Sequence, residues 1–144
     1  MLQKEEQARA ALAGEGVTFA AVSTQGELRT STQKGIAPIM EILKSEAQFL
    51  EGAYVADKVI GKAAALLLVK GKISHLYAGV MSAHAAEALK ENNIPFEYGK
   101  SVPYIINRRK DGMCPMEATV LEETNVEEAY LKLQNKLAEL RGSK

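Results

Sequence analysis

The chain has 144 residues, with 18 basic residues, 18 acidic residues and one cysteine. This length is typical of one domain, so we expect residues 1–144 to form one. Balanced charge argues against dedicated nucleic-acid binding. The longest apolar run, residues 63–69, is far too short to cross a bilayer. We therefore expect no membrane role. One cysteine excludes an internal disulfide and fits a reducing cytoplasm, where we expect the protein to lie.

The first half of the chain predicts helices around one hairpin. Helix formers that end at a glycine and apolar spacing near 3.6 residues indicate helices. A β-branched run followed by a turn indicates a hairpin. In chain order they predict a helix over 2–13, hairpin strands over 17–23 and 27–32, a helix over 36–49, a short extended piece over 53–56, and a helix from Lys58 to about Val69.

The second half predicts strands alternating with helices. In chain order these are a strand over 73–81, a helix over 83–91, strands over 94–98 and 102–106, a short helix beginning near Cys114, and a last helix over 126–140 that Asn125 caps. Such alternation implies a mostly parallel sheet with helices on both faces. The opening hairpin makes the sheet mixed. We therefore expect a three-layer α-β-α domain of the α/β class, with about five strands.

Asp57 is interpreted as an N-cap, which would place Lys58 and Lys62 one turn apart on the same helix face. Lys58 would then oppose the helix dipole, and the helix is otherwise apolar. One interpretation is that both lysines face a bound phosphate or carboxylate. The other is that Asp57 caps the helix and the lysines extend to solvent.

Two further helix starts carry candidate chemistry. Ser82 suits an N-cap, and His84 in the first turn of that helix could donate to a ligand or move a proton. Pro115 suits the first helical position and favours an extended Cys114, where a thiol tends toward thiolate. Glu117 falls where it can return a hydrogen bond to the cap. Alternatively, Cys114 is a small buried apolar residue.

No zinc motif is present. Zinc needs three or four ligands, and only His75, His84 and Cys114 offer nitrogen or sulfur, without CxxC, HxxxH or HxE spacing. The glycines fit neither the dinucleotide fingerprint nor the phosphate loop. We therefore expect no metal and no cofactor.

The order of elements resembles the cytidine-deaminase-like superfamily. The strings GAYVADKVIGKAAALLLV, VPYIINR and GMCPME are similar to a small bacterial family of unknown function with that fold and without its zinc motif. The resemblance covers about residues 17–140. Zinc deaminases carry the motif H-x-E at the start of one helix and P-C-x-x-C at the start of the next. The resemblance implies that the Asp57-Lys58 segment takes the place of H-x-E, and that residues 81–84 take roughly the place of P-C-x-x-C. Neither supplies zinc ligands, so deamination by zinc-bound water is not expected.

Three functional hypotheses follow. The first is a zinc-independent protein that binds a small nucleotide-like or anionic ligand. Its polar contacts would come from Lys58, Lys62, Ser82, Asn107, Arg108 and Glu117. The second is an enzyme with Cys114 as nucleophile, in which His84, Asp57 or Glu117 positions or moves protons. The third is a non-catalytic regulatory module, since the resemblance implies a homo-oligomer.

Overall fold

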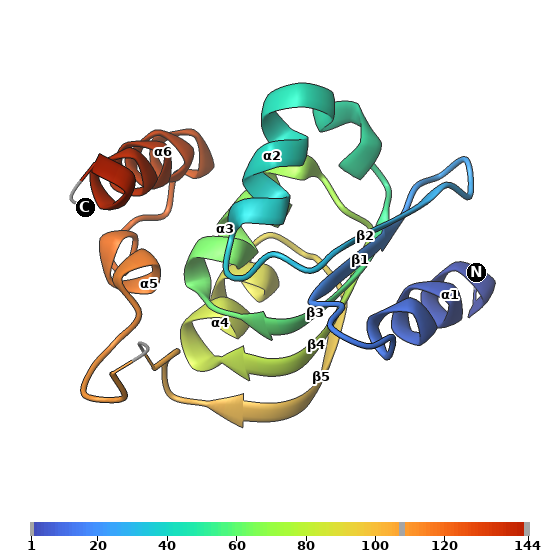
Figure 1. The fold of residues 1–144 in the computed structure, drawn as a ribbon, viewed down its shortest axis with the longest axis horizontal. Coiled ribbons are helices and arrows are strands. Elements are labelled where there is room, and N and C mark those ends of the chain that lie inside the picture. The colour runs from blue at the N-terminus through green and yellow to red at the C-terminus, as the bar shows by residue number, and fades with distance from the viewer. Residues whose placement is uncertain (1, 107–108, 143–144) are drawn as a thin grey trace.

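The computed structural model describes residues 2–106 and 109–142, and its centre is a mixed five-stranded sheet (Figure 1). The strands lie in the order β2-β1-β3-β4-β5. Their bounds are β1 Phe19–Val22, β2 Leu28–Ser31, β3 Tyr54–Ile60, β4 His75–Ser82 and β5 Phe96–Val102. The helices are α1 Leu2–Leu12, α2 Ala37–Glu46, the 3-10 helix η1 Ala47–Leu50, α3 Lys62–Gly71, α4 Ala83–Glu91, α5 Pro115–Thr119 and α6 Val126–Gly142.

Strand direction divides the sheet into two parts. β1 is antiparallel to both β2 and β3, whereas β3, β4 and β5 are parallel to one another. The parallel strands are joined through α3 and α4, which pack together on one face of the sheet, and α1 packs against β1 and β3 on the other (Figure 1). The three layers and the mixed five-stranded sheet confirm the predicted α/β fold class.

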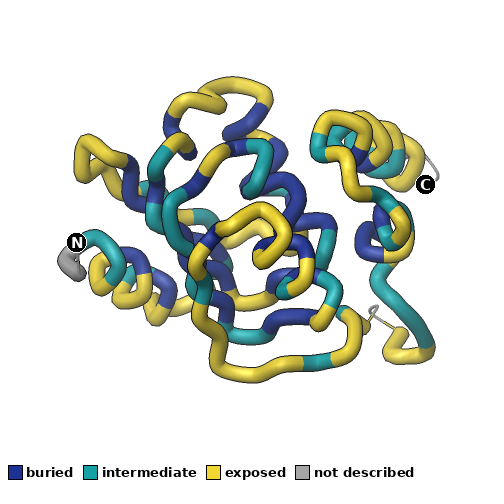
Figure 2. The backbone as a smooth tube through the Cα atoms, turned by 180° about the vertical axis from the view of Figure 1, so that it is seen from behind, coloured by how far each residue is buried: buried dark blue, intermediate teal, exposed yellow. Residues whose placement is uncertain are grey.

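The main core lies between the sheet and α3. This helix is so rich in small and apolar residues that Ala63 to Leu68 are all buried, and Figure 2 shows the buried tube concentrated at the centre. A smaller cluster under α1 contains Ala8, Leu12, Val22 and Ala56. Burial of these apolar side chains is the dominant favourable contribution to folding. Among the residues described, no helix has the length and apolar character needed to cross a bilayer.

The predicted helix cap at Asp57 is wrong, because Asp57 and Lys58 lie within β3. Asp57 is paired with Phe19 of β1 on one side and with Ala78 of β4 on the other. The Lys58 N–H also donates to the Thr18 carbonyl. Pairing on both sides satisfies more backbone groups than a local cap could, so β3 continues to Ile60 and α3 begins at Lys62.

The predicted strand over 102–106 is also wrong. β5 extends from Phe96 through Val102, and beyond it Ile106 forms only an isolated antiparallel bridge with Met113. Pro103 follows the last residue of β5 and has no N–H to donate to a ladder. The chain therefore leaves the sheet here and crosses toward α5.

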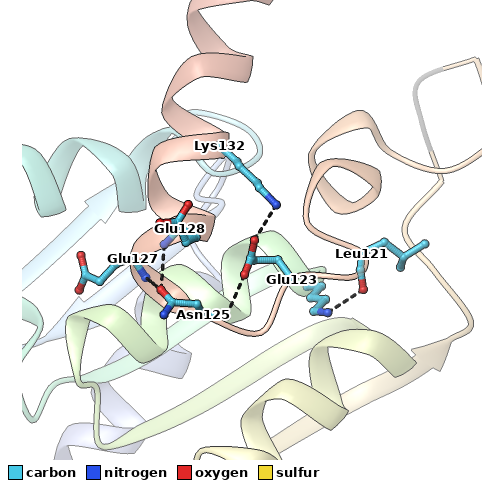
Figure 3. Close-up of polar contacts among 7 residues, drawn as sticks. Leu121, Glu123, Asn125, Glu127, Glu128 and Lys132 are labelled. Carbon is cyan, nitrogen blue, oxygen red and sulfur yellow. Dashed lines mark hydrogen bonds and ion pairs between the residues drawn. The ribbon is translucent and has the colours of Figure 1, made fainter.

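Two predicted caps are confirmed. Ser82 precedes α4, and its hydroxyl accepts the Ala85 N–H at 3.1 Å. Asn125 precedes α6, and its Oδ1 accepts the N–H groups of Glu127 at 2.9 Å and Glu128 at 3.0 Å (Figure 3). Each cap satisfies N–H groups that have no partner within the helix.

Gly79 of β4 allows a close backbone approach, and its replacement by alanine should destabilise the protein. A Cβ at this position would lie 2.8 Å from the Lys58 carbonyl oxygen of β3. Because that neighbour is backbone, we expect Gly79→Ala to lower the free energy of unfolding by about 1–3 kcal/mol. Urea denaturation measures the change. Ser101→Ala on exposed β5 is the control and should alter it by less than about 0.5 kcal/mol. Equal stability of Gly79→Ala and the wild type would contradict this geometry.

Candidate functional site

The first turns of α3 and α4 lie at the carboxyl ends of neighbouring parallel strands, β3 and β4. We call the place where these two helix starts meet the α3–α4 junction. It is formed by Gly61, Lys62 and Ser82. Helix N-termini offer free N–H groups and a partial positive charge, so they favour anions. Carboxyl ends of parallel strands are also where open α/β sheets commonly bind ligands.

The side chain of Glu117 occupies the α3–α4 junction from α5. Its Oε2 accepts the Lys62 N–H at 2.8 Å and the Ser82 hydroxyl at 2.5 Å. Its Oε1 accepts the Ile105 N–H at 2.6 Å. Glu117 is only 1% exposed. The carboxylate therefore joins both helix starts to the segment that follows β5.

Gly61 makes room for this carboxylate. It takes the N-cap position of α3 with extended backbone, so it has no side chain with which to cap the helix. A Cβ at Gly61 would lie 2.8 Å from Cγ1 of Ile105 and 3.3 Å from Oε2 of Glu117. Any larger residue would displace the groups that cap α3 from outside.

Lys62 connects the junction to the segment between α5 and α6. Its ammonium donates to the Leu121 carbonyl at 2.7 Å, and that carbonyl with its hydrogen bond appears in Figure 3. Two residues further, Glu123 forms an ion pair with Lys132 of α6 at 2.6 Å. Lys62 therefore contributes both its backbone N–H and its side chain to holding the C-terminal segment against α3.

Asp57 is a second buried carboxyl, with 6% of its surface exposed. It shares a sheet face with its register partners Phe19 and Ala78, which belong to the main core. Its Oδ1 accepts the Val59 N–H at 3.2 Å. Burial raises the pKa of Asp57 to about 8, although the backbone N–H groups of Val59 and Lys58 favour the charged form. At neutral pH the carboxyl is therefore mostly protonated.

The structure brings together three of the proposed ligand-binding residues, Lys62, Ser82 and Glu117. Lys58 is exposed on β3, so it does not share a helix face with Lys62, and that expectation is corrected. Asn107 and Arg108 lie outside the described residues. Their proposed contacts stay predictions.

The proposed catalytic residues lie on three different elements. His84 is half-buried in the first turn of α4, and Asp57 is within β3. Cys114 takes the N-cap position of α5, as predicted, but its side chain makes no capping hydrogen bond. Its N–H donates to the Ile105 carbonyl, and Glu117 does not return a bond to it. The thiol-enzyme hypothesis stays a prediction.

Three contributors to the junction were not predicted from the sequence. Ile105 and Leu121 act through backbone N–H and carbonyl groups, which every residue carries, so the sequence gives no signal for them. Gly61 does carry a signal, since a glycine between a strand and a helix often marks a close approach. Within the ranges 2–106 and 109–142, no three His, Cys, Asp or Glu side chains gather as a group that could hold a metal ion.

Comparison with known proteins identifies the family. Residues 7–137 match the family described as a domain of unknown function, DUF1893, and the chain belongs to this family. It is similar to the crystal structure of a DUF1893 family protein from Thermotoga maritima, with 31% identity and a TM-score of 0.86 over 94% of this chain and 91% of that chain. RibD of Acinetobacter baumannii is matched at 17% identity and a TM-score of 0.43, over 68% of this chain and 33% of RibD. No curated protein matches.

The protonation of Asp57 should make stability depend on pH. Its pKa rises from 3.8 to about 8 on folding. The folded state therefore binds the proton more tightly, and the stability that this contributes is lost as pH rises from about 4 to 8. We expect the free energy of unfolding to fall by up to about 1.4 kcal/mol per pH unit in this window. Asp57→Asn should remove that slope and be more stable than the wild type at pH 8, as measured by urea denaturation.

The control for Asp57 is Glu122→Gln, an exposed position that should keep the wild-type slope. Arg29 lowers the pKa of Glu46 and Lys132 lowers that of Glu123, so these two carboxylates make stability rise with pH near the lower end of the window, opposite in sign to Asp57. An unchanged slope in Asp57→Asn would contradict a protonated Asp57.

Proposed function

We propose that this member of the DUF1893 family is a metal-independent protein that binds a small anionic ligand, carrying a carboxylate or a phosphate, at the α3–α4 junction. The observation that carries the proposal is the Glu117 carboxylate itself. It receives two backbone N–H groups and one hydroxyl from three separate parts of the chain. Donors arranged in this way select an oxyanion, whether it belongs to a side chain or to a ligand.

In this proposal Glu117 holds the junction when no ligand is bound. An incoming carboxylate or phosphate takes over the same donors, and α5 moves away from α3 with its glutamate. The Lys62 ammonium bonds a neighbouring carbonyl of Leu121, and release of that bond would direct a positive charge toward the ligand. Gly61 leaves room for the ligand's oxygens close to the backbone.

The finer prediction is a nucleotide-like ligand. A phosphate at the junction would leave the rest of such a ligand free to make further polar contacts, and those proposed from Asn107 and Arg108 lie outside the described residues. The oligomeric-module hypothesis is independent of this site and stays a prediction.

Removal of the Glu117 side chain should create a junction that small carboxylates fill. Glu117→Ala leaves the Lys62 N–H, the Ser82 hydroxyl and the Ile105 N–H without their acceptor, so we expect a loss of about 2–5 kcal/mol in the free energy of unfolding. Acetate or propionate should restore part of this loss, while equal concentrations of chloride should not. Thermal denaturation followed by circular dichroism measures both effects.

Two controls separate an anion site from a merely structural contact. Glu122→Ala, at an exposed position, should respond to acetate as the wild type does. Glu117→Gln keeps the shape but not the charge, so it should be less stable than the wild type. In the wild-type chain, inorganic phosphate should shift the amide resonances of Lys62, Ala85 and Ile105. The proposal fails if Glu117→Gln matches the wild type and acetate does not stabilise Glu117→Ala.

A further inference from the structure

A groove of about 430 Å³ lies between β2 and α2, away from the α3–α4 junction. We call it the β2–α2 groove. One side is formed by β2 and the residues that follow it, and the other by α2. The lining residues are Phe19, Arg29, Thr30, Ser31, Thr32, Gln33, Pro38, Glu41, Ile42 and Ser45. Because β2 forms one side of the groove, the outer edge of this strand determines how an extended chain could bind there.

β2 is an edge strand, with β1 on one side only. The Glu27 carbonyl accepts the Ser23 N–H, and the Ser31 carbonyl accepts the Thr18 N–H, so the odd-numbered residues face β1. Alternate residues of an antiparallel strand direct their backbone groups to opposite edges. The N–H and carbonyl groups of Leu28 and Thr30 therefore face outward, along the open edge. Within the described part of the chain they form no hydrogen bond.

The groove carries one unpaired negative charge beside an apolar floor. Arg29 is already engaged, since its guanidinium bonds Glu46 at 2.8 Å and lies 4.2 Å from the Phe49 ring centroid. Glu41 of α2 is exposed, and among the described residues its carboxylate has no ion-pair or hydrogen-bond partner. Phe19 and Ile42 form the apolar floor beside it, although they are only 1% and 9% exposed. The groove therefore favours a partner whose basic side chain meets Glu41 and whose neighbouring apolar side chain is small.

We propose that the β2–α2 groove binds an extended peptide of a partner protein, which adds a strand to β2 and places a lysine or arginine against Glu41. Strand addition uses the free backbone groups of an edge for affinity and side-chain pockets for specificity. Pro38 to Ser45 spans about 10 Å of helix, which matches about three extended residues. Apolar and basic side chains two residues apart would point to the same face and reach the floor and Glu41 together.

A second copy of this chain fits the groove less well than a peptide. Antiparallel pairing of two β2 strands about a two-fold axis puts both helix layers on the same side of the joined sheet. The partner's α2 would then approach the α2 that forms the groove wall. A single extended strand has no helix layer to accommodate.

The test uses a defined probe, the blocked peptide acetyl-Thr-Val-Thr-Lys-Thr-amide, titrated into the ¹⁵N-labelled protein. We expect saturable amide shifts at Leu28 to Ser31 and along α2. The matched peptide with glutamate in place of lysine should bind about tenfold more weakly, because it meets Glu41 with the same charge. Two further peptides carry N-methyl groups on the odd or on the even amides. One of the two should lose binding, because only one set of amides faces β2.

Variants of Thr30 test the same edge from the protein side. Thr30→Pro removes an N–H that faces outward, a position where an edge strand tolerates proline. It should weaken peptide binding about tenfold, whereas Thr30→Val should not. If Thr30→Pro fails to fold, binding of the two N-methylated peptides to the wild-type chain still tests whether β2 pairs with the peptide. The proposal is overturned by the absence of shifts at millimolar peptide, by equal binding of both N-methylated peptides, or by dimerisation of the free protein through β2.

Discussion

The fold depends on how the start of α3 is satisfied. A helix begins with N–H groups that have no partner inside it, and burying them without acceptors is costly. Gly61 cannot accept a hydrogen bond through a side chain. The acceptor comes instead from Glu117, 55 residues further along the chain. A buried carboxylate in turn needs hydrogen-bond donors. The helix start and the glutamate therefore each satisfy a polar group that would otherwise be buried without a partner.

α3 and α4 begin side by side but are satisfied in different ways. Ser82 caps α4 from within, because its hydroxyl accepts the Ala85 N–H while donating to Glu117. α3 depends on a side chain from the C-terminal segment. One carboxylate therefore completes both helices and fixes the position of α5. A ligand that competes for these donors would act on the attachment of that whole segment, through Lys62 and Leu121 as well.

Local signals explain which elements could be predicted from the sequence. Ser82 and Asn125 cap helices through contacts two or three residues away, so the pattern of nearby residues was sufficient. Asp57 followed by lysine looks equally like a cap, yet β1 and β4 pair on both sides of it. That pairing involves residues far away in the sequence. The prediction of a strand over 102–106 failed for a local reason, because Pro103 has no N–H to donate to a ladder.

The site was partly predictable for the same reason. The pattern Cys114, Pro115, Glu117 correctly placed the start of α5, but local reasoning sent the glutamate back to its own cap. In the structure the Cys114 N–H donates to the Ile105 carbonyl instead, and the glutamate accepts from the starts of α3 and α4. Asp57, the other buried carboxyl, accepts an N–H of its own strand in place of helix-start donors, and burial keeps it protonated. The domain therefore contains one carboxylate stabilised by helix starts and one carboxylic acid kept neutral by the core. Only the first is surrounded by donors that another anion could use.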